Sequence, residues 1–187
     1  MKKDPMHYCD LDIAECDGVY PPSEDSFLII EYASCSGKAI EIGCGTGIVS
    51  ICFLKRGCDI EAVDISDLAV ECAKDNASRN GLTLKVYRSD LFSGVSGTYD
   101  TILFNAPYIP VEGEDASWSG GRNLEVVSRF LGQAREHLSA SGQIYIVLSD
   151  LTDNEGMFRM MGYDYFIIKK ISFEFEAIVL YKLTLKA

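Results

Sequence analysis

The tetrad at residues 105–108 could bind the NH2 group of an amide or of an aromatic amine. The side-chain carbonyl of Asn105 and the backbone carbonyl of Ala106 are neutral acceptors, so together they could hold both hydrogens of that group. They would stabilise positive charge that develops on its nitrogen, without removing a proton first. Pro107 stiffens the turn, and Tyr108 offers an aromatic wall to a planar group. We interpret Asn105 and Tyr108 as catalytic, with Ala106, Pro107 and Ile109 as further substrate contacts; the structural alternative is an Asx turn before a proline.

A glycine-rich segment at residues 41–47 (Glu-Ile-Gly-Cys-Gly-Thr-Gly) follows an apolar run and precedes a helical pattern. Glycines at this place let the backbone approach a ligand closely. The spacing is G-x-G-x-G rather than G-x-G-x-x-G, and a tight strand–helix turn is the alternative. Asp64 closes the next apolar run, about 20 residues further on, where an acidic side chain can bind ribose hydroxyls. The loop and Asp64 together predict a nucleoside ligand.

Asp90 and Leu91 follow the third expected strand. A carboxylate there could accept a hydrogen from an adenine amino group, and the next backbone N–H could bind a ring nitrogen. Asp90 alone could equally be a turn residue. However, Asp64, Asp90 and Asn105 each follow or close a strand, and ligands of open α/β sheets bind at the carboxyl ends of the strands. We therefore expect these three side chains around one site.

The elements that must position these residues alternate along the chain. The apolar patterns predict helices at 24–33, 48–56, 124–138 and 151–161. They predict another between Ser66 and Gly81, with an apolar face of Leu68, Ala69, Cys72 and Ala73. They predict strands at 38–42, 59–63, 82–88, 99–104, 143–148, 163–171 and 175–183. The long polar segment through Gly121 is expected to be a loop. Alternating strands and helices imply a mostly parallel sheet with helices on both faces, and the last two strands should pair as a hairpin that adds an antiparallel strand.

Length and charge limit the possible functions. The 187 residues suit one domain, with a preamble at 1–37 and a core at 38–187. The 17 basic and 28 acidic residues give a net charge of −11, so a nucleic acid is a poor partner and a basic protein or loop a better one. The sequence has no apolar run of about 18 residues and no signal peptide, so we expect no membrane span and a cytoplasmic protein.

The seven cysteines are expected to be buried, reduced thiols. Their odd number argues against a full disulfide framework, and Cys44, Cys52 and Cys72 lie inside apolar patterns. No C-x-x-C pair is present, so we expect no metal site.

Three motifs resemble those of the HemK-like glutamine methyltransferases. Residues 105–108 resemble the N-P-P-Y motif of N-methyltransferases, and residues 20–26 (Tyr-Pro-Pro-Ser-Glu-Asp-Ser) resemble their Y-x-P-x-E-D-[ST] opening. Residues 118–122 (Trp-Ser-Gly-Gly-Arg) resemble a W-x-G-G-[RK] loop of the eukaryotic and archaeal subgroup. The resemblance covers residues 20–183. Ala106 departs from the first proline of N-P-P-Y, which puts the rate in question rather than the activity, since the backbone carbonyl is the group used.

The resemblance implies the class I methyltransferase fold, a Rossmann-like, seven-stranded, mostly parallel sheet with an antiparallel last strand. It implies S-adenosyl-L-methionine as cofactor and, as substrate, the glutamine of a Gly-Gly-Gln loop in a class I translation release factor. Trp118 would cover the substrate, although a lone tryptophan is often a packing anchor. The cofactor-binding residues would be Ser26, Glu41, Gly43, Gly45, Gly47, Asp64, Ile65, Asp90, Leu91 and Asn105.

The subgroup works with a small zinc-binding activator protein. In the strand order of this fold the strand at residues 83–88 lies at an edge of the sheet, where unpaired backbone groups could accept a strand of another chain. We expect a heterodimer through that edge. Side chains should alternate along it, with Leu82, Leu84 and Val86 on one face, and Lys85 and Arg88 are the only cations that could guard it. An ordinary edge strand covered by its own helices is the alternative.

Two other functions compete. A nucleic-acid adenine N-methyltransferase would also suit the tetrad, but it needs a basic groove or a base-flipping surface, which the net charge disfavours. A non-catalytic cofactor-binding scaffold would be favoured by an altered Asn105 or a broken glycine loop, and both are intact.

Overall fold

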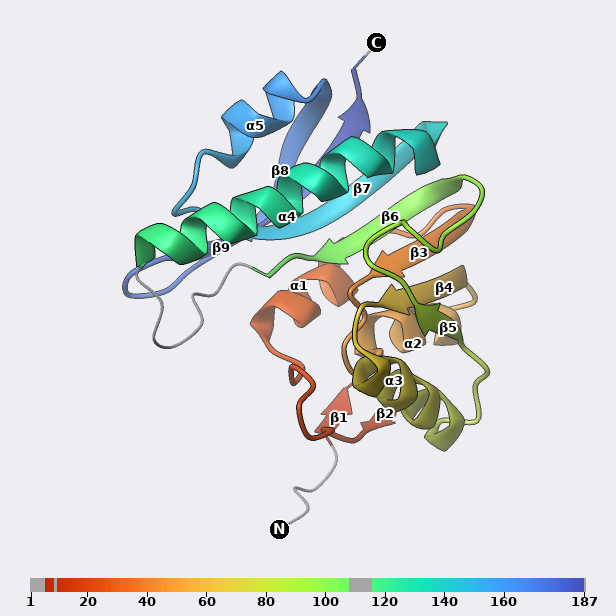
Figure 1. Ribbon diagram of the computed structural model, residues 1–187. Coiled ribbons are helices and arrows are strands. Elements are labelled where there is room, and N and C mark those ends of the chain that lie inside the picture. Colours follow the sequence, from red (N-terminus) through yellow and green to blue (C-terminus); the bar gives the residue numbers. More distant parts are fainter. Residues whose placement is uncertain (1–5, 9, 108–115, 187) are drawn as a thin grey trace.

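The sheet of the computed structural model has seven strands in the order β5-β4-β3-β6-β7-β9-β8 (Figure 1). The structure describes residues 6–8, 10–107 and 116–186, and the side chains of residues 10–107 and 125–186. Four neighbouring pairs from β5 to β7 are parallel, and β9 lies antiparallel to both β7 and β8. The expected mostly parallel sheet with an antiparallel last strand is confirmed. The strands are β3 (Lys38–Ile42), β4 (Asp59–Asp64), β5 (Lys85–Arg88), β6 (Tyr99–Asn105), β7 (Leu138–Ser149), β8 (Tyr163–Ser172) and β9 (Ala177–Leu185).

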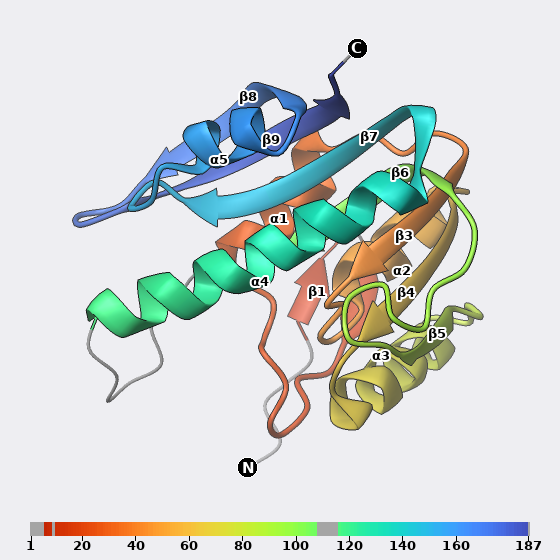
Figure 2. The ribbon, with the colours of Figure 1, turned by 45° about the horizontal axis from the view of Figure 1, so that its top comes forward.

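Helices cover both faces of the sheet (Figure 2). On one face lie α1 (Glu24–Tyr32), α2 (Ile48–Lys55) and α3 (Asp67–Arg79), and on the other lie α4 (Ala116–His137) and α5 (Asn154–Met160). Successive side chains of a strand point to opposite faces. Accordingly, Ala39 joins the buried cluster beneath the first three helices, whereas Ile40 joins the cluster beneath α4 and α5.

Two helices depart from the sequence expectation. The segment 116–121, expected as loop, forms the first part of α4. Gly120 and Gly121 each cost about 1 kcal/mol relative to alanine in a helix, but extending an existing helix is far easier than starting one. The buried side of α4, at Phe130 and Leu131, supplies that existing helix. In α3, Leu68 was expected on the apolar face and is 61% exposed, and Val70 is buried in its place.

The preamble contains a hairpin that was not expected, β1 (Met6–Tyr8) and β2 (Leu11–Ile13). Three-residue strands are too short for a period-2 pattern to stand out. Leu11 and Ile13 are nevertheless fully buried in the cluster formed with α1 to α3. The hairpin therefore belongs to the core of this face.

The expectation of reduced thiols throughout is wrong for four cysteines. Disulfides join Cys16 to Cys72 and Cys35 to Cys58. The partners lie 56 and 23 residues apart in the sequence, and only the docking of the preamble on α3 and the pairing of β3 with β4 bring them together. Cys44 and Cys52 keep their thiols and are buried as expected, and Cys9 lies outside the described residues.

None of the described helices combines the length and the apolar composition that crossing a bilayer requires.

Candidate active site

A cavity of 570 Å³ lies at the carboxyl ends of β3, β4, β5 and β6. It brings together most residues that the sequence assigned to the site. Tyr108 and Ile109 lie outside the described residues, as does the side chain of Trp118, whose backbone is in the first turn of α4. The expected residues that line the cavity are Ser26, Glu41, Gly43, Gly45, Asp64, Ile65, Asp90, Leu91, Asn105, Ala106 and Pro107.

The glycine loop uses its glycines in two different ways. Gly43 and Gly45 line the cavity with φ of +68° and +53°, a region that favours glycine. Gly47 does not line the cavity. A Cβ on Gly47 would lie 2.8 Å from the Cβ of Ala73, so this glycine is needed for α2 to start against α3. The sequence pattern alone does not separate contact with a ligand from contact between helices.

Asp64 holds the loop in place and keeps capacity for a ligand. Its Oδ2 accepts the backbone N–H of Gly45 at 3.0 Å, and its Oδ1 accepts that of Ser66 at 2.9 Å. A carboxylate has about four lone-pair sites. The two sites that remain fit the two hydroxyls of a ribose. Asp64 therefore lies where the sequence predicted a carboxylate that binds ribose.

Glu41 is a buried carboxyl in the wall of the cavity, 2% exposed. Burial raises its pKa to about 8, although hydrogen bonds from the backbone N–H and the hydroxyl of Ser50 act in the opposite direction. A cationic ligand in the cavity would favour the ionised carboxylate. The amino and sulfonium groups of S-adenosyl-L-methionine have the charge that suits this wall.

The turn after β5 has an unusual backbone. Leu91 adopts φ of +48°, a left-handed conformation that costs a leucine free energy. The hydroxyl of Ser89 stabilises it by donating to the carbonyl of Leu91 at 2.7 Å and accepting the N–H of Gly94 at 2.9 Å. This strained turn places Asp90 and Leu91 at the cavity, where we predicted from the sequence that they bind adenine.

Sequence reasoning missed Arg129. Its Nη2 lies 2.7 Å from Oδ2 of Asp90, and both residues line the cavity. Arg129 belongs to α4, on the opposite face of the sheet from α3, and no local motif in the sequence marks it.

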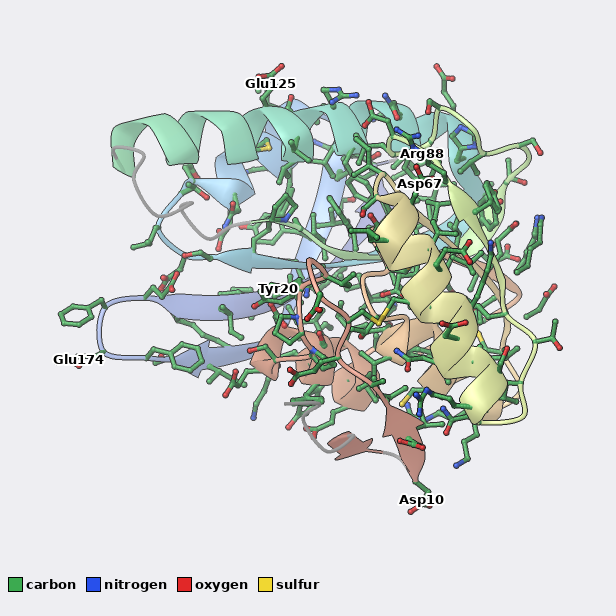
Figure 3. The ribbon with its side chains drawn as sticks, turned by 60° about the horizontal axis from the view of Figure 1, so that its bottom comes forward. Asp10, Tyr20, Asp67, Arg88, Glu125 and Glu174 are labelled. Atoms are coloured by element: carbon green, nitrogen blue, oxygen red, sulfur yellow. A yellow bond between two sulfur atoms is a disulfide. The ribbon has the colours of Figure 1, made fainter. Side chains whose placement is uncertain are left out.

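A segment of the preamble closes the cavity from the side of α3. We call residues 14–22 the strap. Gly18, Val19 and Tyr20 of the strap line the cavity, and Figure 3 shows Tyr20 on the loop that leads into α1. The Tyr20 hydroxyl donates to Asp25 at 3.3 Å, and both burial and the Asp25 carboxylate raise the pKa of that hydroxyl. The motif at residues 20–26 indicated Tyr20 and Ser26, but not the earlier part of the strap.

Asn105 ends β6 at the cavity. Its Oδ1 is buried, and among the described residues no group donates a hydrogen bond to it. Buried polar atoms nearly always have a partner, so an exception points to a strained or functional group. The next residue, Ala106, is 2% exposed and also lines the cavity. The expected strand-end position of the tetrad is confirmed for its first three residues.

Known proteins resemble this chain over most of its length. The family described as "Methyltransferase small domain" matches residues 25–170. A Methanocaldococcus jannaschii protein, provisionally named a protein N5-glutamine methyltransferase, is 33% identical and aligns over 86% of this chain and 89% of its own. Methyltransferase HEMK2 of Mus musculus is 32% identical over 76% of this chain and 77% of its own. Ribosomal RNA small subunit methyltransferase C of Haemophilus influenzae is 31% identical, but only 38% of that protein is covered.

Solved structures share the fold. The Mtq2–Trm112 complex of E. cuniculi, described as responsible for the methylation of the translation termination factor eRF1, has a TM-score of 0.69 at 20% identity, with 90% of this chain and 99% of that chain covered. A Bacteroides fragilis methyltransferase bound to S-adenosyl-L-homocysteine has a TM-score of 0.60 at 18% identity, with 89% and 78% covered. Its ligand is the product of methyl donation by S-adenosyl-L-methionine, in agreement with the expected cofactor. The chain belongs to the methyltransferase small domain family.

Proposed function

We propose that this chain transfers a methyl group from S-adenosyl-L-methionine to the side-chain amide nitrogen of the glutamine in the Gly-Gly-Gln motif of a class I translation release factor. It acts in the cytoplasm as the catalytic subunit of a heterodimer with a small zinc-binding activator. The names of the M. jannaschii relative and of the E. cuniculi complex support the substrate, and the second also supports an activator.

The observation that carries the proposal is the partnerless Oδ1 of Asn105. A buried acceptor at the cavity, with no donor among the described residues, is suited to an incoming N–H. A primary amide brings two N–H groups, and the carbonyl of Ala106 is the natural acceptor of the second. Both acceptors are neutral, which suits a group that is uncharged before the reaction.

These residues would act by orientation and electrostatics. When bound, S-adenosyl-L-methionine supplies an electrophilic methyl group on a sulfonium. Asn105 and Ala106 hold the amide so that its nitrogen faces that methyl, which removes the cost of bringing the two groups together in solution. The nitrogen–methyl bond would form as the methyl–sulfur bond breaks, and the electron pair of the broken bond would stay on the sulfur as a neutral thioether. Positive charge would then develop on the nitrogen, where the two carbonyl oxygens would stabilise it. One of the held protons then leaves the nitrogen for water, so no side chain has to act as a strong base.

The cavity residues would divide the cofactor among them. Asp64 has free lone pairs for the ribose, and Glu41 gives the buried carboxyl suited to the cationic methionine part. Asp90 and Leu91 would hold the adenine. Ser26, whose backbone N–H and hydroxyl are oriented by Asp25, would contact the cofactor from α1.

The activator would bind the edge strand β5. Within the described sheet, β5 pairs with β4 alone, so its other edge is available. The expected alternation is present, with Leu84 and Val86 buried and Lys85 exposed. Beside the end of β5, Ile65 and Leu68 are 60% and 61% exposed, an apolar surface that a partner could cover.

The two cations expected to guard this edge are engaged within the chain. Lys85 Nζ lies 2.5 Å from Glu61, and Arg88 Nη1 lies 3.1 Å from Asp67. Figure 3 labels Arg88 and Asp67 near the start of α3. Hydrogen exchange with and without the activator tests this interface. Slower exchange of the amides of residues 85–88 in the pair supports it. Protection that appears only elsewhere on the chain contradicts it.

Radiolabelled methyl transfer tests the proposed substrate. The chain, with its activator, is incubated in parallel with purified release factor, with a release factor in which the Gly-Gly-Gln glutamine is asparagine, with DNA and with RNA. We expect label in the first only, because the asparagine amide falls one methylene short of Asn105. Label in nucleic acid and none in the release factor would instead support the adenine N-methyltransferase alternative.

A further inference from the structure

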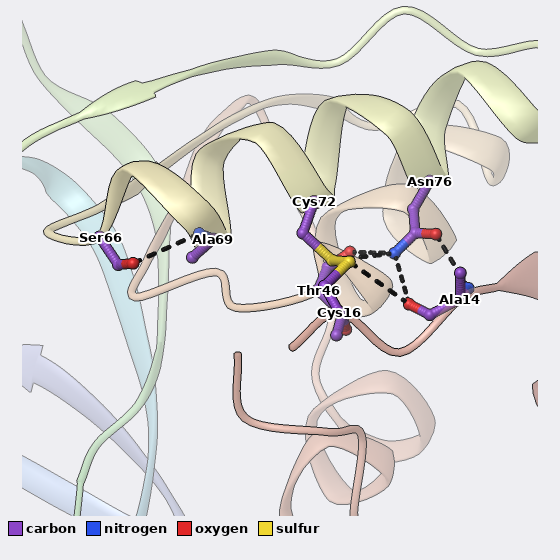
Figure 4. Close-up of a disulfide and its surroundings, with 7 residues drawn as sticks. All are labelled: Ala14, Cys16, Thr46, Ser66, Ala69, Cys72 and Asn76. Carbon is purple, nitrogen blue, oxygen red and sulfur yellow. Dashed lines mark hydrogen bonds between the residues drawn. A yellow bond between two sulfur atoms is a disulfide. The ribbon is translucent and has the colours of Figure 1, made fainter. Parts of the chain in front are cut away.

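Asn76 on α3 uses its whole side-chain amide to join two other segments (Figure 4). Its Oδ1 accepts the backbone N–H of Ala14 at 2.9 Å. Its Nδ2 donates to the carbonyl of Ala14 at 3.1 Å and to the carbonyl of Thr46 at 3.0 Å. Asn76 is fully buried, so its amide depends on these backbone partners, and the bond to Thr46 is itself buried.

Both segments line the cofactor cavity. Thr46 belongs to the glycine loop and lines the cavity. Ala14 begins the strap, whose residues Gly18 to Tyr20 line the cavity too. The walls approach each other closely, since a Cβ on Gly45 would lie 3.6 Å from the carbonyl oxygen of Tyr20.

We propose that Asn76 is a positioning residue for the methyl donor, which sets the spacing between the glycine loop and the strap that together hold the nucleoside. This inference rests on the proposed cofactor site in the same cavity. Asn76 itself does not line the cavity and therefore acts through Thr46 and Ala14.

Asparagine is the residue type that this place requires. The site needs one acceptor and two donors within a short side chain, which is the inventory of an asparagine amide. Aspartate would direct a carboxylate at the carbonyls of Ala14 and Thr46. Alanine would leave the carbonyl of buried Thr46, and the N–H and carbonyl of half-buried Ala14, without this partner.

Asn80, the C-cap residue of α3 and four positions after Asn76, is a matched control. It holds Asp12 in the same way, with Oδ1 accepting the Asp12 N–H at 2.9 Å and Nδ2 donating to the Asp12 carbonyl at 3.0 Å. Its other Nδ2 hydrogen goes to the carbonyl of Asn76 at 2.7 Å, within the same helix. Asn80 thus anchors the preamble without reaching the glycine loop.

The test compares Asn76→Ala, Asn80→Ala and Asp64→Ala by calorimetric titration with S-adenosyl-L-homocysteine and by thermal unfolding. We expect Asn76→Ala to raise the Kd by about tenfold, from the loss of buried hydrogen bonds between the walls. Asn80→Ala should lower Tm while its Kd stays within about twofold of the unchanged chain. In methyl transfer, Asn76→Ala should raise KM for S-adenosyl-L-methionine and leave kcat at saturation near its original value.

The outcomes separate this inference from the proposed site. If Asp64→Ala weakens binding and Asn76→Ala does not, the positioning role of Asn76 is wrong and the cofactor site stands. If Asp64→Ala leaves the Kd unchanged, the cofactor site is wrong and the inference fails with it.

Hydrogen exchange of the unsubstituted chain gives a second test, which does not depend on whether any variant folds. S-adenosyl-L-homocysteine should slow exchange of the Ala14 amide, which Asn76 holds, and leave the Asp12 amide, which Asn80 holds, nearly unchanged. Equal effects on both amides, or none on Ala14, would contradict the proposal.

Discussion

Arg129 on α4 and Asp90 after β5 form an ion pair in the wall of the cavity, with 2.7 Å between Nη2 and Oδ2. The pair joins α4 to the turn after β5, which is proposed to hold adenine. It occupies Oδ2 of Asp90 and leaves Oδ1 for the adenine amino group. Arg129 would therefore orient the carboxylate that recognises the base.

Replacing Arg129 by methionine should weaken binding of S-adenosyl-L-homocysteine by up to about fivefold, the size expected when a partly exposed ion pair is lost. Arg135→Met is the control, because Arg135 lies on the same helix and donates to the carbonyl of Met161, away from the cavity. Calorimetric titration measures both. Equal losses of affinity in the two variants would show that substitution in α4 weakens binding generally, without a specific role for Arg129.

The pKa of Glu41 predicts a pH dependence of stability. The folded chain keeps a proton on Glu41 up to about pH 8, whereas an exposed glutamate loses it near 4.5. Glu41 therefore contributes its full stabilisation below about pH 4.5, and this contribution decreases as the pH rises to about 8.

Glu61 does not change its charge in this pH range, because its pKa is about 2. Burial acts to raise that pKa, but the hydrogen bonds from Lys85, Tyr99 and Lys38 lower it by more.

Accordingly, Tm should fall between about pH 5 and about pH 8, and Glu41→Gln should flatten that decrease. Differential scanning fluorimetry across this range measures it. A variant whose Tm follows the same slope as the unchanged chain would show that Glu41 is already ionised in the folded protein.

The Cys16–Cys72 disulfide should stabilise both the fold and the strap. It closes a span of 56 residues, for which loop-closure entropy corresponds to about 4 kcal/mol. Cys16→Ser should lower Tm and also weaken cofactor binding, because Cys16 is in the strap. Cys35→Ser should lower Tm alone, since neither Cys35 nor Cys58 lines the cavity. Titrations of oxidised protein decide this, and an unchanged cofactor affinity for Cys16→Ser would refute the role of the disulfide in the strap.

The parts of the site that the sequence predicted are those at the ends of strands. The glycine loop, Asp64, Asp90 and Asn105 are found there because a parallel sheet brings the carboxyl ends of its strands to one edge. Patterns of apolar residues were sufficient to derive that sheet. Local chemistry then identified the polar residues at its edge.

The parts that the sequence could not predict depend on contacts between distant segments. Arg129 reaches Asp90 across 39 positions, and Asn76 reaches Ala14 across 62. Neither contact leaves a periodic signal. The disulfide partners were missed for the same reason. The start of α4 was missed because helix propensity favoured a loop at Gly120 and Gly121, while packing further along the helix extends it through them.

Asn105→Ala should reduce kcat for methyl transfer by about 10²–10³, the usual effect of removing one positioned polar group from an active site. The Kd for S-adenosyl-L-homocysteine and the Tm should change much less, because Oδ1 makes no hydrogen bond with the described residues that the fold would lose. Asn154→Ala offers a contrast. Asn154 is buried, and its Nδ2 donates to the Ser149 carbonyl at 2.7 Å, so its loss should lower Tm. Near-normal turnover by Asn105→Ala would exclude the proposed amide site.

Mass spectrometry of the methylated product locates the transferred methyl group on the release factor. Release factor is incubated with the chain, its activator and S-adenosyl-L-methionine carrying a deuterated methyl group, digested and fragmented. We expect one labelled residue, the glutamine of Gly-Gly-Gln, with the label on its side-chain nitrogen, and no label with the Asn105→Ala variant. Label on any other residue, or no label in the release factor while RNA or DNA is labelled under the same conditions, would contradict it.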